Sequence, residues 1–282
     1  MKTLKTIIVA ALVVAAPLIF SGCSKYIDAA KEDTQLTENT DYSIHSNMIL
    51  PIIGTYTELN NTEWEDFPLI SVRGDDVNAG GLGDQQDFAE TDSYNYNKDY
   101  WMYNSLFQNY YKNMFSAHSA MEQITLYKEN GASATLADQY ISEAKVLNSW
   151  WLFQLSRTWG ALLIPSSSDP SALFVTPLSS KDEVMQYISD RMDEAIPNLP
   201  AVRPNERTDI PGGVTKYTAL AMKALANLEL KNYQAVAEAT GEIINSGKFQ
   251  LESDYYELFK IRGKLNNENI LEMQYSDLGQ GS

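Results

Sequence analysis

The sequence has few of the residues on which metal centres and nucleophilic catalysis depend. Its 282 residues include one cysteine, Cys23, and two histidines, His45 and His118. One cysteine cannot form a disulfide within the chain, and two distant histidines offer neither a transition-metal cluster nor a Ser-His or Cys-His pair. We therefore expect a protein that is not an enzyme, with no catalytic residue, no metal and no cofactor.

Positive charge is also scarce. The chain carries 21 Lys and Arg against 37 Asp and Glu, a formal net charge of −16. Nucleic acid and anionic lipid surfaces both require positive charge on the protein that binds them. The composition therefore predicts no nucleic-acid partner, whereas it does not disfavour a neutral ligand.

The first 22 residues resemble a secretory signal. Lys2 and Lys5 precede an apolar run from Ile7 to Phe20, which is short for a membrane span. Ser-Gly-Cys at residues 21–23 resembles a bacterial lipobox, with Phe20 in place of the usual leucine. We predict a lipoprotein signal peptide at 1–22 and acylation of Cys23, which would attach the protein to a membrane lipid. The alternative is an ordinary cleaved signal followed by an unmodified cysteine.

The next segment, residues 23–40, is polar and charged with few large apolar side chains. Such a composition cannot form a packed core and is typical of a tether. From residue 41 the composition becomes that of a globular protein. We therefore predict one folded domain over 41–282.

Residues 136–160 form the strongest helix signal in the chain. Their apolar side chains recur at steps of three and four and make one stripe: Leu136, Tyr140, Ala144, Leu147, Trp151 and Leu155. Gln139, Lys145, Ser149 and Ser156 lie off that stripe, and around Trp150–Phe153 the polar side disappears. A helix that is apolar nearly all round must be enclosed by others, so this one is predicted to be the central rod.

Similar periodicity predicts further helices, which pair along the chain. They cover residues 45–59, 104–125, 181–196 with a Ser180–Glu183 capping box, 217–228 and 236–244. The last pair resembles a degenerate tetratricopeptide unit. We predict a mostly α fold of stacked tetratricopeptide-type helix pairs with long irregular loops, and short strands near Leu163 and Ile270.

Several separated blocks resemble one known family. Residues 143–160 contain Glu-Ala-Lys, then Trp-Trp-x-Phe-x-Leu and Trp-Gly, and residues 215–226 contain Thr-Lys-x-x-Ala-x-Ala. Residues 246–259 begin Ser-Gly-Lys-Phe-x-Leu, and residues 267–276 read Asn-Glu-Asn-Ile-Leu-Glu-Met-Gln-Tyr-Ser. Together these blocks resemble the SusD/RagB family, and the last resembles a strand of that family.

The resemblance implies a surface lipoprotein of the kind that Bacteroidetes use for nutrient uptake. The protein would be anchored in the outer membrane, facing outside. It would capture an oligosaccharide or polysaccharide and deliver it to a SusC-like TonB-dependent transporter. Family members continue for a comparable length beyond this sequence, so we expect an N-terminal part. The alternatives are a tetratricopeptide-like adaptor that binds another protein, and an uptake lipoprotein that binds peptide rather than sugar.

The irregular stretch between residues 60 and 101 has the composition that sugar binding requires. Aromatic faces stack on pyranose rings, and carboxylate, amide and guanidinium groups bond the hydroxyls. The candidate ligand-binding residues are Trp64, Arg73, Asp75, Asp76, Asn78, Tyr96 and Trp101. The aromatic residues can equally pack on the helices beneath them.

The same stretch permits two other interpretations. The spacing from Asp76 to Asp87 resembles a calcium loop with Asn78, glycine at the sixth position and Asp84, but Gly80 occupies a ligand position. Asp75 with Asp84, Asp87 or Glu90 could form a glycosidase pair. Spacing within a loop does not determine the distance between two carboxylates, so neither interpretation is adopted.

Overall fold

The computed structural model describes residues 40–60, 70–80, 86–95 and 97–274. The predicted signal peptide, Cys23 and nearly all of the predicted tether lie outside these residues. The elements discussed below belong to the unit Ser43–Ser282. Within the described ranges, none of the helices combines the length and the apolar character that crossing a membrane would take.

Helix α7 (Ala134–Trp159) is the centre of the fold, as predicted. It contacts α3 (Ile49–Thr57), α6 (Trp101–Glu129), α8 (Lys181–Ala195) and α9 (Lys216–Glu229). The Ser133 side chain accepts a hydrogen bond from Leu136 N at the start of α7, and Gly160 ends the helix with φ 82°. Trp151 is 1% exposed.

Two serines of α7 correct the prediction. Ser149 and Ser156 were assigned to the polar side of the helix, yet both are buried. Because helices surround α7 on several sides, even positions off the main stripe are covered. Ser156 Oγ donates to the carbonyl oxygen of Gly160 at 3.0 Å, which satisfies its hydroxyl within the core.

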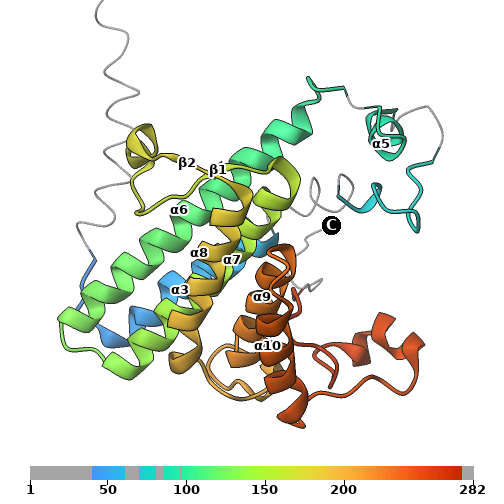
Figure 1. Ribbon diagram of the computed structural model, residues 1–282. Helices are drawn as coiled ribbons and strands as arrows, with labels where there is room; N and C mark the ends of the chain where they lie inside the picture. The colour runs from blue at the N-terminus through green and yellow to red at the C-terminus, as the bar shows by residue number, and fades with distance from the viewer. Residues whose placement is uncertain (1–39, 61–69, 81–85, 96, 275–282) are drawn as a thin grey trace, which may run out of the picture. The chain divides into compact units, whose positions relative to one another are not determined.

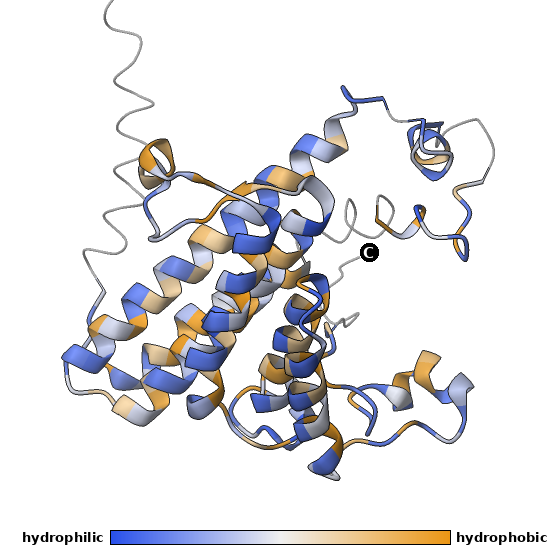
Figure 2. Ribbon diagram, in the orientation of Figure 1, coloured by the Kyte–Doolittle hydropathy of each residue, from blue (hydrophilic) through white to orange (hydrophobic). Residues whose placement is uncertain are grey.

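The other long helices follow one another in a stack, with α10 (Tyr233–Asn245) last. Contacts are most extensive between consecutive helices, from α6 with α7 to α9 with α10. Figure 2 shows hydrophobic and hydrophilic residues alternating along these helices, as expected where one face is buried. The observed arrangement confirms the mostly α fold of stacked helix pairs.

Short elements decorate the stack. They are η2 (His45–Met48), η3 (Glu58–Asn60), α5 (Gln86–Asp92), η4 (Pro170–Val175), η5 (Ile196–Asn198), η6 (Pro204–Glu206), η7 (Tyr255–Phe259) and η8 (Ile261–Gly263). Helix α8 begins with the predicted capping box, in which Ser180 and Glu183 bond reciprocally. Pro197 lies in η5, directly after α8.

Two residues each from β1 (Leu162–Leu163) and β2 (Leu178–Ser179) form an antiparallel ladder, with Leu162 opposite Ser179. The strand predicted near Ile270 is wrong, because residues 266–274 contain only turns, bends and irregular backbone. No strand lies beside them among the described residues. Instead, Ile270 packs against the core between α9 and α10, and its carbonyl accepts from Thr218 Oγ1 at 3.1 Å.

A buried polar cluster joins the loop between α8 and α9 to two helices. Arg207 Nη2 donates to Glu143 Oε1 of α7 at 2.8 Å, and Arg207 Nε donates to Asp209 Oδ1 at 2.8 Å. Tyr56 of α3 donates to Glu143 Oε2 at 2.5 Å and accepts from Val214 N at 2.7 Å. Each buried charge thus has a partner, which offsets the large cost of removing it from water.

Burial and pairing pull the pKa values of this cluster in opposite directions. Burial raises the pKa of Glu143 and prevails over the neighbouring Arg207 guanidinium and the Tyr56 hydroxyl. For Asp209, partial burial is outweighed by hydrogen bonds and attraction from Arg207, which lower its pKa to about 2. The pKa of Arg207 is raised, because the two carboxylates outweigh its own burial.

Candidate functional site

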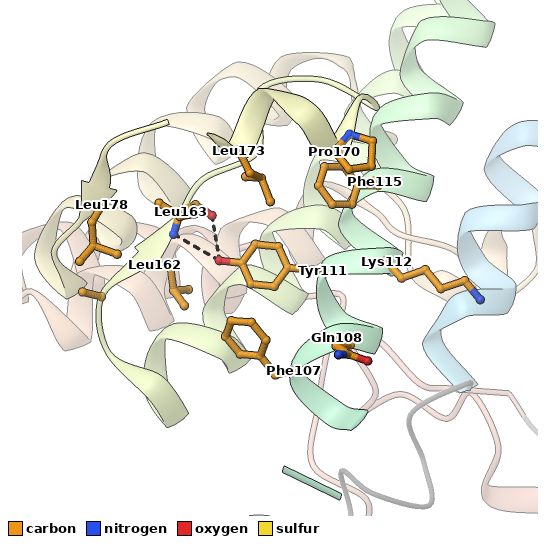
Figure 3. A pocket seen from close by; sticks show the side chains of 11 residues that line it. Phe107, Gln108, Tyr111, Lys112, Phe115, Leu162, Leu163, Pro170, Leu173 and Leu178 are labelled. Atoms are coloured by element: carbon orange, nitrogen blue, oxygen red, sulfur yellow. Dashed lines mark hydrogen bonds between the residues drawn. The ribbon is translucent and has the colours of Figure 1, made fainter. Parts of the chain in front are cut away.

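A cavity of about 560 Å³ lies between α6 and the segment that carries β1, η4 and β2 (Figure 3). We call it the apolar pocket. Its lining consists of Phe107, Gln108, Tyr111, Lys112, Phe115, Ala161, Leu162, Leu163, Pro170, Leu173 and Leu178.

The polar groups of the apolar pocket are poorly placed for a sugar. The Tyr111 hydroxyl donates to the Leu163 carbonyl at 3.0 Å and accepts from Leu163 N at 3.2 Å, so it is already engaged. The Lys112 side chain extends away from Tyr111 and Leu163 (Figure 3). A pyranose would leave its hydroxyls without partners on this wall, at a cost in free energy for each.

A second cavity, of about 290 Å³, has a different character. We call it the loop pocket. Its described lining is Ile70, Arg73, Thr91, Lys98, Tyr103, Leu106, Thr158 and Trp159. Segments far apart in sequence therefore converge there: the stretch around Arg73, the end of α5, the start of α6 and the last turn of α7.

Hydroxyls and an indole are set around the loop pocket. Thr91 Oγ1 and the Tyr103 hydroxyl are 2.5 Å apart and share a hydrogen bond. Trp159 is half-buried, and its ring meets Phe107 edge-on with centroids 5.4 Å apart. Because Phe107 lines the apolar pocket and Trp159 the loop pocket, this ring pair lies between the two cavities.

Tyr94 holds a strained backbone position beside the loop pocket. Its φ is 58°, a left-handed conformation that non-glycine residues adopt at a cost. The bonds Tyr94 N to Thr91 O and Asn95 N to Glu90 O make the helix-ending turn in which glycine is usual. Tyr94 is 60% exposed, Arg73 Cζ lies 5.9 Å from the centroid of its ring, and the phenol donates to Arg73 O at 2.7 Å.

The structure separates the residues predicted to bind ligand. Arg73 lines the loop pocket, whereas Asp75, Asp76 and Asn78 are exposed and do not line it. Trp101, 58% exposed, is the first residue of α6 and is likewise outside the lining.

Three of these side chains lie close to their own neighbours in sequence. Asn78 Oδ1 accepts from Gly80 N at 2.7 Å, and Asp76 Oδ1 lies over Gly74, 2.9 Å from where a Cβ would stand there. Trp101 meets Tyr100 edge-on, with centroids 6.1 Å apart. Trp64 and Tyr96 lie outside the described residues.

Sequence reasoning missed several pocket residues. Three of them, Thr91, Lys98 and Tyr103, lie in or next to the irregular stretch between residues 60 and 101. Nothing in their spacing set them apart from their neighbours. Trp159 had a usable signal. It ends α7 beyond the buried stripe, directly before the glycine terminator, where a large aromatic ring is not needed to fill the core.

Neither alternative interpretation of this stretch gains support. The described residues contain no group of three or more His, Cys, Asp or Glu side chains able to hold a metal ion. Asp84, which both interpretations use, lies outside the described residues. His118 is buried in α6, and burial together with Arg191 lowers its pKa.

Comparisons with known proteins agree with the resemblance of the sequence to the SusD/RagB family. No family model matches the chain. A SusD-like protein from Bacteroides ovatus is 22% identical over 183 residues, covering 61% of this chain and 32% of that protein. SusD-like protein P38 from Formosa agariphila is 28% identical over 120 residues, covering 41% of this chain and 22% of that protein.

The fold has relatives among solved structures. Surface glycan-binding protein A from Bacteroides fluxus superposes with a TM-score of 0.69 at 20% identity, covering 80% of this chain and 49% of that one. The matched part of the chain thus corresponds to about a third or less of the length of each curated relative, and to about half the length of this solved structure. In its sequence blocks, its curated relatives and its stacked helical fold, the chain is similar to SusD-like proteins.

Proposed function

We propose that the chain is a carbohydrate-binding protein and that the loop pocket holds a sugar residue. The observation that carries the proposal is the convergence, in a SusD-like fold, of an indole, hydroxyls and cationic side chains on one cavity. Binding sites for small molecules combine apolar walls with a few convergent polar groups in this way. Among the described cavities, the loop pocket fits a pyranose better than the larger apolar pocket does.

The parts of the loop pocket have distinct roles in this proposal. The Trp159 ring would offer a face to the C–H side of a pyranose, and the exposed Tyr94 ring, which is outside the lining, lies beside Arg73, which belongs to it. Thr91 Oγ1 donates to Asp87 O at 2.7 Å and accepts from the Tyr103 hydroxyl, so the Tyr103 oxygen would accept from a sugar hydroxyl and Arg73 would donate to sugar oxygens. No nucleophile or acid–base pair is needed for capture.

We further propose that the protein acts at the cell surface. Acylation of Cys23 would anchor it in the outer membrane, facing outside, and the helical stack would support a SusC-like TonB-dependent transporter that takes over the captured glycan. Support comes from the lipobox-like sequence at Cys23 and from the name of the Bacteroides fluxus relative, a surface glycan-binding protein. Protease added to intact cells should degrade the protein, and resistance to it would oppose surface exposure.

Affinity electrophoresis against plant, host and microbial polysaccharides tests the binding proposal. The chain should be retarded by at least one polysaccharide, and Tyr94→Gly should lose that retardation. Because glycine adopts the left-handed backbone of this position readily, the substitution removes the ring without adding strain.

Tyr233→Gly provides a matched control, since Tyr233 is 65% exposed, comparable to Tyr94, but lies on α10. It should be retarded like the unaltered chain. Retardation by none of the polysaccharides would refute carbohydrate binding by this chain. Equal loss of retardation in Tyr94→Gly and Tyr233→Gly would refute the location of the binding site at the loop pocket.

A second candidate is an adaptor that binds another protein. It is favoured by large apolar side chains left exposed on α10 and after it, among them Ile244 at 75%, Tyr255 at 73% and Ile261 at 87%. An adaptor predicts no polysaccharide retardation. It also predicts a partner that co-purifies with the chain and with Tyr94→Gly, but not with Ile244→Glu.

A further inference from the structure

The apolar pocket has no part in the proposed carbohydrate binding, yet its volume of about 560 Å³ is typical of a small-molecule site. The wall that faces α6 is unusual for this chain. Residues 161–180 contain one charged side chain, Asp169, although 21% of the chain is charged. The pocket therefore suits a ligand that needs no polar partner along most of its length.

Apolar side chains line the pocket on both sides. Leu173 of η4 points toward Tyr111 of α6 (Figure 3), and the rings of Phe107 and Phe115 continue the α6 wall. Because the Tyr111 hydroxyl both donates to and accepts from the backbone of Leu163, its ring is the part that a ligand can contact. A flexible hydrocarbon chain would bury its methylene groups here without leaving a hydrogen bond unmade.

Two polar side chains of the lining lie together on α6. Gln108 and Lys112 are four residues apart, so they share one face of the helix, and both are exposed. Lys112 is the only charged side chain in the described lining, and it extends away from Tyr111 (Figure 3). An ammonium and an amide can both donate to a carboxylate at the edge of the pocket.

Each wall of the pocket also carries a carboxylate, and serines hold both of them. Asp169 accepts from Ser171 N at 2.8 Å and from Ser171 Oγ at 2.6 Å. Glu122 accepts from Ser168 N at 3.0 Å and from Ser168 Oγ at 2.5 Å, and it is about 15 Å along α6 from Lys112. A ligand carboxylate can therefore meet Lys112 without displacing either of them.

We infer that the apolar pocket binds a long-chain carboxylate, with the hydrocarbon chain between α6 and η4 and the carboxylate at Gln108 and Lys112. This site is independent of the proposed carbohydrate binding at the loop pocket. The ligand is the free amphiphile rather than the acyl chain of a bilayer lipid. A free chain leaves water when it enters the pocket, whereas a chain in a bilayer is already out of water and gains little.

Isothermal titration calorimetry of the chain with octanoate, decanoate and dodecanoate, each below its micelle-forming concentration, tests the apolar part. Affinity should rise about fourfold with each added methylene group. Leu173→Ser, which removes apolar wall, should weaken decanoate binding roughly tenfold. Ala161→Trp, which fills the pocket from an exposed position, should weaken it as well.

Phe174→Ser is the matched control for Leu173→Ser, since Phe174 is 91% exposed on η4 and does not belong to the lining. It should bind decanoate like the unaltered chain. An affinity that does not depend on chain length, or equal losses in Phe174→Ser and Leu173→Ser, would overturn the assignment to the pocket.

Decyltrimethylammonium, a cation with the same chain as decanoate, tests the head group. The unaltered chain should bind decanoate more tightly, and Lys112→Gln should weaken decanoate roughly threefold without weakening the cation. Equal affinity for the two amphiphiles would overturn the choice of an anion. Cosedimentation with phosphatidylcholine vesicles in the absence of decanoate binding would overturn the site and assign the exposed apolar side chains to a membrane.

Discussion

At Arg207 and Glu143 the chain keeps two opposite charges in its core. The Glu143 side chain is 0% exposed and the Arg207 side chain 2% exposed, and each depends on the other to compensate its lost hydration. A pair of this kind is tolerated while complete and becomes costly when half of it is removed. The stability of the loop that precedes α9 therefore depends on both members of this ion pair being present.

Arg207→Met should destabilise the protein by about 3–5 kcal/mol, because it leaves Glu143 charged and buried without its guanidinium partner. Urea unfolding measures the change. Lys128→Met is the control, since Lys128 and Asp138 form an exposed pair with side chains 37% and 40% accessible. That substitution should change stability by less than about 0.5 kcal/mol. Equal costs for the two variants would contradict the role of the buried pair.

Asp209 should make the protein sensitive to acid. Its folded pKa of about 2 lies below the ordinary value of 3.8, so its stabilising effect is complete above pH 3.8 and disappears as the pH falls through 2. Because Asp209 is partly exposed, the effect is discounted to about 1 kcal/mol. Urea unfolding of Asp209→Asn should show this deficit at pH 6 and a smaller one at pH 2.5. A deficit independent of pH would contradict the linkage.

Single residues also show where sequence reasoning reached its limit. Trp101 and Trp159 are equally suitable stacking residues by type, and only the structure shows that Trp159 lines a cavity and Trp101 does not. Arg73 was predicted and does line the pocket. Tyr94 is not among the residues predicted to bind ligand, and its left-handed φ is a conformation in which a tyrosine is not expected.

At the scale of elements, the end of α7 depends on a backbone conformation that only glycine adopts easily. Gly160 has φ 82° and ψ −113°, and a Cβ at this position would meet no atom within 4 Å. Any cost of a side chain there is therefore backbone strain rather than a clash. The turn determines how the chain leaves Trp159 and enters β1.

Gly160→Ala should destabilise the protein by about 1–3 kcal/mol through that strain. Gly241→Ala is a matched substitution inside α10, where a Cβ also meets nothing and φ is not positive. It should stabilise the protein by roughly 0.5–1 kcal/mol, because alanine has the higher helix propensity. Opposite shifts in melting temperature are expected. Shifts of the same sign would contradict the account of Gly160.

Elements with local signals were predictable, and elements that need a partner were not. The Ser180–Glu183 box and the α7 stripe are contained in short windows of sequence, and both are present. The segment around Ile270 has the composition of a strand, but a strand exists only where another strand offers its hydrogen bonds. Among the described residues, Ile270 instead completes the core beside α9.

At the scale of the whole molecule, the helical stack follows from periodicity and the site does not. Apolar residues at steps of three and four determine which helix faces meet, so the order α6 to α10 could be anticipated. The loop pocket is built from the stretch around Arg73, the end of α5, the start of α6 and the last turn of α7, which includes Trp159. No window of sequence contains that combination.

The most direct test of the central claim is hydrogen–deuterium exchange of the chain with and without the polysaccharide that it retains. Binding at the loop pocket predicts slower exchange in 70–80, in the first turn of α6 and in the last turn of α7, with α10 unchanged. Slower exchange confined to 161–179, around the apolar pocket, or in none of these segments would contradict the assignment of the glycan site.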